Sequence, residues 1–199
     1  MGKIGRRQRL ETAHHEAARC AAIAHGLSVE SVSVLPADGP AGTAGGAHLD
    51  QAIFSADHNP NGQVAALKID IVVALAGPAA RMKLRPRKRK EWGDNFKLAQ
   101  AWASWAAFLA SGMSIAELDA DGKIELSDEQ QLFADQLLEQ CEQRAHQIVE
   151  ERWAEITTIA EELIDRTQLN ADDLDALLGH RRDHNLRLLL GGNHETKPG

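Results

Sequence analysis

Aromatic side chains are scarce in this sequence, and their scarcity narrows the fold class. The 199 residues include no tyrosine, four tryptophans and four phenylalanines, together 4% of the chain. A core with few large rings is built mainly from Ala, Leu, Ile and Val, and alanine favours helices over strands. With 43% hydrophobic and 26% charged residues, the composition predicts a globular, mainly helical protein of one domain or two small ones.

Cysteines and long apolar runs are also few. Cys20 and Cys141 are far apart and no C-x-x-C occurs, which argues against a disulfide framework and a thiolate metal site. The longest apolar runs, 71–80 and 101–110, are shorter than the ~20 residues that span a bilayer. No apolar stretch follows the basic residues near the N-terminus, so no secretory signal is expected. These absences predict a cytoplasmic protein without a membrane segment.

Charge is unevenly divided along the chain. The formal net charge is −7, but residues 1–111 sum to +5, residues 112–179 to −14 and residues 180–199 to +2. A basic front half and an acidic back half can attract each other or face different partners. We divide the chain accordingly into residues 1–111, residues 112–178 and a C-terminal tail, residues 179–199.

Apolar residues at helical spacing, together with capping residues, predict the helices. Gly77-Pro78 is expected to kink or end the second helix. Ser127 and Asn170 are the expected N-caps of the last two helices. The predicted helices cover about residues 4–24, from 63 to the Gly-Pro pair, 94–111, 127–164 and 170–178.

Strand signals are confined to one short region. Residues 31–35 alternate and are rich in valine, and a second short strand is expected at 48–54, after a glycine-rich loop. The predicted fold class is therefore mainly α (α+β), a helical bundle with a small β-sheet. Seven of the ten residues 81–90 are basic. We interpret this run as a solvated loop, with a nucleic-acid patch as the alternative.

The segment 12–20, Thr-Ala-His-His-Glu-Ala-Ala-Arg-Cys, contains the pair His15-Glu16. In a helical H-E-x-x-H motif, two histidines four residues apart share a zinc ion, and the glutamate acts as general base on the zinc-bound water. Here the second histidine position is Arg19. Glu16 is therefore the candidate catalytic base, and His15 is a candidate metal ligand.

Together with later segments, this helix resembles the zinc peptidase domain of the FtsH family. In that family a Tyr-His-Glu-Ala-Gly-His helix precedes a strand that ends in proline, an apolar helix that ends in Gly-x-Ala-Ala-Glu, a Gly-Met-Ser turn and a Leu-Leu-Glu-x-Glu-Thr-Leu segment. The corresponding residues here are 12–20, 31–36, 72–80, 111–114 and 163–174. The matches keep the same order and cover roughly residues 10–178.

The resemblance implies a zincin-like FtsH peptidase-domain fold over residues 1–178. In the family, both motif histidines and a later Asp in a Ser-Asn-Asp-Leu stretch hold zinc. Alignment by residue type puts Asp94 in the place of this Asp, whereas alignment on the apolar Phe96 puts Asn95 there, and both alignments stay open. The resemblance thus makes His15 and Asp94 the zinc ligands, with Glu16 activating water for attack on a peptide carbonyl.

Two arginines depart from the family's pattern. Arg19 replaces the second zinc histidine, and Arg81 stands where the family has the Glu of Gly-x-Ala-Ala-Glu. A guanidinium stays charged and has no lone pair for a metal, and a catalytic zinc site needs three protein ligands. We therefore expect zinc binding to be lost or weak, with Arg19 paired to Glu16 or Asp94.

Two functions from different classes follow. The first is an FtsH-type peptidase-like protein with a degenerate zinc site, which binds polypeptide segments or a protein partner. The alternative is an active zinc metalloendopeptidase that hydrolyses unfolded polypeptides with a rearranged ligand set, for which His48 or His58 is a candidate. No G-x-x-x-x-G-K-[ST] loop occurs, so no ATP site is expected in this chain. Because the family forms hexameric rings, a homo-oligomer is also expected; nucleic-acid and membrane partners are not.

Overall fold

Helices make up most of the part of the chain that the computed structural model describes, residues 5–23, 29–36, 44–49, 60–86, 93–113 and 124–178. A small sheet accompanies them, so the expected mainly helical class is confirmed. The elements in chain order are α1 (Arg6–Ile23), β1 (Val29–Pro36), β2 (Ala44–Leu49), α2 (Pro60–Leu84), α3 (Gly93–Ala110), α4 (Asp128–Glu151), α5 (Trp153–Arg166), β3 (Gln168–Asn170) and α6 (Ala171–Leu178).

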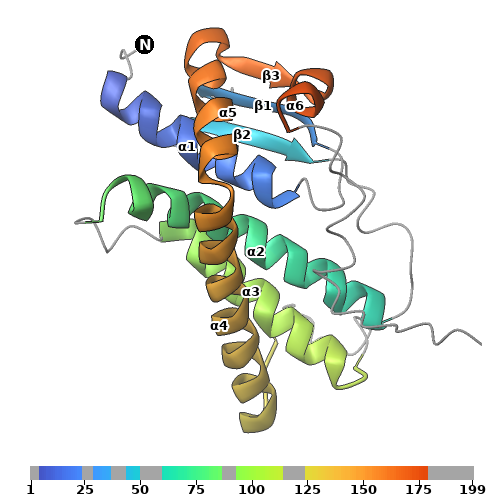
Figure 1. Ribbon diagram of the computed structural model, residues 1–199. Helices are drawn as coiled ribbons and strands as arrows, with labels where there is room; N and C mark the ends of the chain where they lie inside the picture. Colours follow the sequence, from blue (N-terminus) through green and yellow to red (C-terminus); the bar gives the residue numbers. More distant parts are fainter. Residues whose placement is uncertain are drawn as a thin grey trace, which may run out of the picture.

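Helix α1 lies between the sheet and the other long helices. It contacts β1 and β2 on one side, α2 on another, and α5 along much of its length. Helix α3 packs on α2, and α4 packs on both of them. Figure 1 shows the sheet at one end of the molecule, with α1, α2 and α3 following in turn and the α4–α5 segment running across them. Helix α1 is therefore enclosed from several directions.

The sheet has the order β2-β1-β3, and both pairings are antiparallel. Strand β1 confirms the strand predicted at 31–35. Strand β2 begins at residue 44, inside the predicted loop, and residues 50–54 of the predicted second strand lie outside the described residues. Strand β3 was not predicted. Leu169 of β3 pairs with Val32 of β1, so a segment late in the chain adds a strand to a sheet that begins early in the chain.

Helix α2 continues through Gly77-Pro78 to Leu84, so the predicted end of this helix at the Gly-Pro pair is wrong. A proline inside a helix costs about 3 kcal/mol, because one hydrogen bond is lost and its ring crowds the preceding turn. All ten residues 71–80 are buried. Burying each large aliphatic side chain contributes about 1.5–3 kcal/mol, so burial outweighs the cost of the proline.

The first part of the basic run is also helical, which corrects the predicted solvated loop. Arg81, Lys83 and Arg85 are only partly exposed. Lys83 forms an ion pair with Glu150, and Arg85 forms one with Glu11. The long aliphatic stems of these side chains pack on the protein while their charged ends reach carboxylates. Residues 87–90 lie outside the described residues.

By length and composition, residues 62–84 of α2 pass as a membrane-spanning helix, with a mean hydropathy of 1.5 in their most apolar window. The helix nevertheless lies among α1, α3 and α4, and 67% of that window is buried inside the protein. A helix at the centre of a core has the same composition as a membrane span. The cytoplasmic location stays a prediction from the sequence.

The single long helix predicted over residues 127–164 is interrupted at Arg152, where α4 ends and α5 begins. Arg152 leaves helical geometry, with φ −112° and ψ 21°. Its guanidinium donates to the carbonyl oxygen of Ala21 and pairs with Glu155. The side chain of Arg152 thus satisfies the end of α1 while the backbone turns α5 toward the sheet.

The predicted caps are confirmed. The Ser127 side chain accepts a hydrogen bond from the backbone N–H of Gln130, whose side chain binds the Ser127 N–H in return. Asn170 and Asp173 form the same reciprocal arrangement at the start of α6. These bonds satisfy N–H groups that have no partner within the helix.

Small side chains form much of the core, as the scarcity of aromatics predicts. Five buried alanines of α1 belong to the same core as four of α2 and four of α3. Small side chains allow helix axes to approach closely. The alanines are Ala13, Ala17, Ala18, Ala21 and Ala22 on α1, Ala74, Ala76, Ala79 and Ala80 on α2, and Ala99, Ala103, Ala106 and Ala107 on α3.

Thr167 ends α5 in the left-handed region, with φ 68°. A β-branched residue is strained there, whereas glycine is not. We expect Thr167→Gly to raise the free energy of unfolding by about 0.5–1 kcal/mol, measured by urea denaturation. Thr158→Gly, in the middle of the same helix, is the matched control and should lower it by a similar amount. Destabilisation by both variants would contradict the strain at Thr167.

Candidate functional site

The segment that carries the H-E pair is buried throughout. Every residue from Thr12 to Ala18 is buried, since the sheet, α2 and α5 surround this part of α1. Three of these residues are strongly polar: His14 and His15 are each 4% exposed and Glu16 is 3% exposed. Buried polar groups need partners inside the protein. The site is therefore defined by the partners that these three side chains find.

His15 lies against the backbone of α2 at Gly77. A Cβ atom placed on Gly77 would come within 2.6 Å of Nε2 of His15, far inside van der Waals contact. Only glycine leaves room for the ring at this position. Gly77 therefore lets the imidazole lie between the two helices.

Glu16 is held by the arginine that replaces the second motif histidine. Nη1 of Arg19 donates to Oε2 of Glu16 at 3.1 Å, and the Glu16 side chain is 4% exposed. Oε1 of Glu16 lies 3.9 Å from Nε2 of His15. Of the two ion-pair partners expected for Arg19, Glu16 is confirmed.

A second arginine faces the site from α2. Arg81 lies one helical turn beyond Gly77 and so on the same side of the helix. Burial, followed by the charges of Arg81 and Arg19, holds the pKa of His15 well below its usual range, and a backbone hydrogen bond at Gly77 acts in the opposite direction. His15 is therefore neutral at physiological pH and lies between two guanidinium groups.

His14 belongs to a different part of the core. Its Nδ1 donates to the carbonyl oxygen of Leu10 at 3.0 Å, and its ring lies 5.4 Å from the ring of Trp153. Nζ of Lys83 lies over the Trp153 ring, 5.0 Å from its centroid. His14 thus joins α1 to α5 and is not part of the His15 site.

Asp94 does not join His15. It lies in the first turn of α3, its side chain is 99% exposed, and it contacts Lys97 at 3.3 Å. His15, in contrast, has a side chain that is 5% exposed. Helix α3 packs on α2 and α4, which places Asp94 away from the H-E pair. Asn95 is half-buried on the same turn.

The residues present at the H-E pair do not fit a zinc ion. The described residues contain no cluster of three or more His, Cys, Asp and Glu side chains suited to a metal. Among the described residues, His15 is the one metal-binding type of nitrogen at this site, and the two arginines repel a cation. For His48 the structure describes only the backbone, in β2, and His58 lies outside the described residues.

The sequence analysis identifies Arg81 as a departure from the family's pattern but places it in a loop, and it does not identify Asp70. The spacing of four residues between Gly77 and Arg81 is the signal that would have placed Arg81 on the same face of one helix. Asp70 lies seven residues before Gly77, on the same side of α2, and is 7% exposed. Burial raises the pKa of Asp70 to about 6. Nothing in the local sequence marks this carboxyl as buried.

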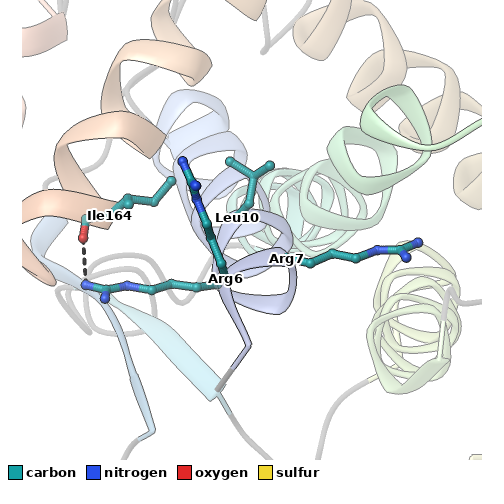
Figure 2. Close-up of a pocket in the computed structure, with 5 residues that line it drawn as sticks. Arg6, Arg7, Leu10 and Ile164 are labelled. Atoms are coloured by element: carbon teal, nitrogen blue, oxygen red, sulfur yellow. Dashed lines mark hydrogen bonds between the residues drawn. The ribbon is translucent and has the colours of Figure 1, made fainter. Parts of the chain in front are cut away.

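An open cleft of about 740 Å³ lies at the other end of α1 (Figure 2). Arg6, Arg7 and Arg9 line it together with Leu10 and Ile164. Nη2 of Arg9 donates to the carbonyl oxygen of Ile164 at 2.6 Å, which is the dashed bond in Figure 2. Three of the lining residues of the cleft are therefore basic. The hydrogen bond of Arg9 connects α1 to α5.

Comparison with known proteins adds no family assignment: no family model matches the chain, and no curated protein matches it. The resemblance to the FtsH peptidase domain therefore rests on the motifs alone.

The close contact at Gly77 is open to a double-mutant test. We expect Gly77→Ala to lower the free energy of unfolding by about 1–3 kcal/mol, because the new methyl group overlaps the His15 ring. In a His15→Ala background the overlap disappears, and Gly77→Ala should become neutral or stabilising through the helix propensity of alanine. Urea denaturation of the four proteins measures the coupling. Equal effects of Gly77→Ala in both backgrounds would contradict the contact.

Asp70 predicts a pH-dependent effect on stability. Its folded-state pKa of about 6 is above the ordinary value of 3.8, so burial penalises the ionised form. The penalty is absent below the ordinary pKa and grows as pH rises through about 6. We expect Asp70→Asn to raise the Tm by about 2–4 °C at pH 8 and to leave it unchanged at pH 4. The exposed control Asp165→Asn should show no such growth with pH; an equal response of the two variants would contradict the burial effect.

Proposed function

We propose that this chain is an FtsH-type peptidase-like protein that has lost zinc catalysis and binds polypeptide segments or a protein partner. One observation carries the proposal: Arg19, at the second ligand position of the motif, forms an ion pair with the buried carboxylate of Glu16. In the chemistry that the resemblance implies, Glu16 must accept a proton from a zinc-bound water. Here an oxygen of that carboxylate instead accepts a hydrogen bond from a guanidinium.

The surroundings of His15 support loss of the metal. A zinc ligand set needs three protein groups, and the second candidate, Asp94, is exposed on another helix. Arg81 adds a second positive charge beside the imidazole. Electrostatic repulsion from two guanidinium groups disfavours a divalent cation at this position.

The exposed apolar side chains support a binding role. Monomeric proteins expose few large apolar side chains close together, and clusters of them are typical of interaction surfaces. Gln130, in the first turn of α4, contacts both Ser111 and Met113 at the end of α3. This contact brings two of the segments that carry such side chains together. The exposed large apolar residues are Leu98, Met113, Leu132 and Phe133.

A nucleic-acid role for residues 81–90 gains no support. Three of the seven basic residues, Arg81, Lys83 and Arg85, lie within the described residues, and all three are partly buried. Two of them are paired with carboxylates. Phosphate binding needs exposed and unpaired cations, so this part of the run is poorly suited to it.

The proposal predicts a protein that binds unfolded polypeptide without zinc and without cleavage. We expect zinc well below one equivalent by elemental analysis of the purified chain, unchanged in His15→Ala. Labelled, unfolded casein should bind by fluorescence anisotropy and remain intact on a gel, with or without chelator. The matched control for activity is Glu16→Gln, which should leave the casein intact as well.

Stoichiometric zinc that is lost in His15→Ala would contradict this proposal. Chelator-sensitive cleavage of casein, abolished in Glu16→Gln, would contradict it too and would establish the active metalloendopeptidase. Absence of casein binding would remove the polypeptide-binding role.

A further inference from the structure

Three polar atoms around His15 have no hydrogen-bond partner. Nδ1 of His15, Nε of Arg19 and Nε of Arg81 are fully buried and unpartnered among the described residues. The His15 side chain itself is 5% exposed. A buried polar atom without a partner costs about 1–3 kcal/mol, and more if the group is charged. Three such atoms from two neighbouring helices, α1 and α2, indicate that this place can accept a further polar group.

Two neighbouring cations on α2 have carboxylate partners. One turn further along the same helix, Arg85 is paired with Glu11, and Lys83 is paired with Glu150. Arg81 has no carboxylate partner among the described residues. The Arg19 guanidinium already binds Glu16 through Nη1, which leaves its Nε–H unused.

The charges at the site indicate which kind of group it can accept. Arg19 and Arg81 are positive, and Glu16 is negative. Among the described residues of the site, at least one positive charge is therefore unbalanced. Asp70 does not balance it, because it precedes Arg81 by eleven residues on α2 and so lies about 16 Å away along the helix axis.

We propose that Arg19, Arg81 and His15 form a binding site for a carboxylate group. A carboxylate supplies the single negative charge that the site lacks, and its two oxygens suit the planar N–H donors of guanidinium groups. Neutral His15 can donate an N–H to the same group. The Arg19 side chain is 23% exposed, so the site reaches the surface on that side.

This inference deepens the proposed function and rests on it only for the source of the carboxylate. A polypeptide carries carboxylates on Asp and Glu side chains and at its C-terminus. Where a catalytic relative would hold a peptide carbonyl beside a metal ion, this chain would hold an acidic group beside two arginines.

Acetate is the simplest probe of the site. We would titrate the full chain with sodium acetate against sodium chloride at constant ionic strength and follow the Nε–H signals of the arginine side chains by NMR. Acetate should shift the Arg19 and Arg81 signals saturably and raise the Tm, whereas chloride should not. Absence of an acetate-specific change in the unmodified protein overturns the site.

Arg81→Gln is the decisive variant, because Arg81 has no carboxylate partner in the described part of the chain and its loss should not unfold the protein. It should weaken acetate binding at least tenfold, since charge-assisted hydrogen bonds are lost. Arg85→Gln, one turn away and paired with Glu11, is the matched control and should keep acetate binding. Equal weakening in the two variants overturns the proposal. So does strong destabilisation by Arg81→Gln together with no acetate effect on the unmodified chain, because the chain itself then supplies the anion.

Peptides distinguish the sources of the carboxylate. A short peptide with a free C-terminus is compared with its amidated form, and a peptide with an internal Glu is compared with the same peptide carrying Gln. Loss of binding on amidation identifies the chain terminus as the ligand, and loss on replacing Glu identifies the side chain. Binding of all four peptides that is indifferent to Arg81→Gln counts against the site.

The casein measurement separates this proposal from the proposed function. If casein binds the unmodified chain and Arg81→Gln equally well while acetate has no effect, the carboxylate site fails and the binding module stands. If casein does not bind but acetate binds through Arg81, the carboxylate site stands and the polypeptide-binding role fails.

Discussion

The contact between the His15 ring and the backbone of Gly77 is the constraint on which the arrangement of helices depends. It requires α1 and α2 to approach so closely that no side chain fits at position 77. The alanines on both helices make the same approach possible along their length. Because the middle of α1 is enclosed by α2, α5 and the sheet, His14, His15 and Glu16 have almost no access to water and need partners inside the protein. The ion pair of Glu16 with Arg19 is a consequence of this enclosure.

Much of the fold follows from local chemistry and was predictable for that reason. Ser127 and Asn170 cap helices through bonds to residues three positions away, and such bonds depend on adjacent sequence alone. The continuation of α2 through Pro78 and the interruption at Arg152 were not predictable in this way. Both depend on what packs against the helix from distant parts of the chain, which outweighs the local preference. Strand β3 is too short to show a recognisable sequence pattern, and it forms because its backbone pairs with β1.

The part of the candidate site that lies on α1 was predictable from the sequence, whereas the contribution of α2 was not. The H-E pair and the Arg19 substitution lie within one turn of α1, so spacing was enough to expect the ion pair with Glu16. The role of Arg81 depends on which face of α2 meets α1, and periodicity does not reveal it when all residues from 71 to 80 are buried. A uniformly apolar helix has no preferred face in its sequence. The Gly77 position becomes informative only when the His15 ring is seen on it.

The two arginines are best understood together, as a replacement of one charge arrangement by another. Relative to the family pattern that the chain resembles, a neutral histidine has become Arg19 and an anionic glutamate position has become Arg81. These changes add three positive charges in total, whereas a zinc ion contributes two. The change to Arg19 alone adds one positive charge, and the change to Arg81 alone adds two, as many as a zinc ion. Together they add one positive charge more than a zinc ion does. The excess is the same unbalanced charge that the unpartnered Nε atoms of Arg19 and Arg81 reveal. The proposed loss of the metal and the proposed affinity for a carboxylate therefore have one common origin, this pair of substitutions.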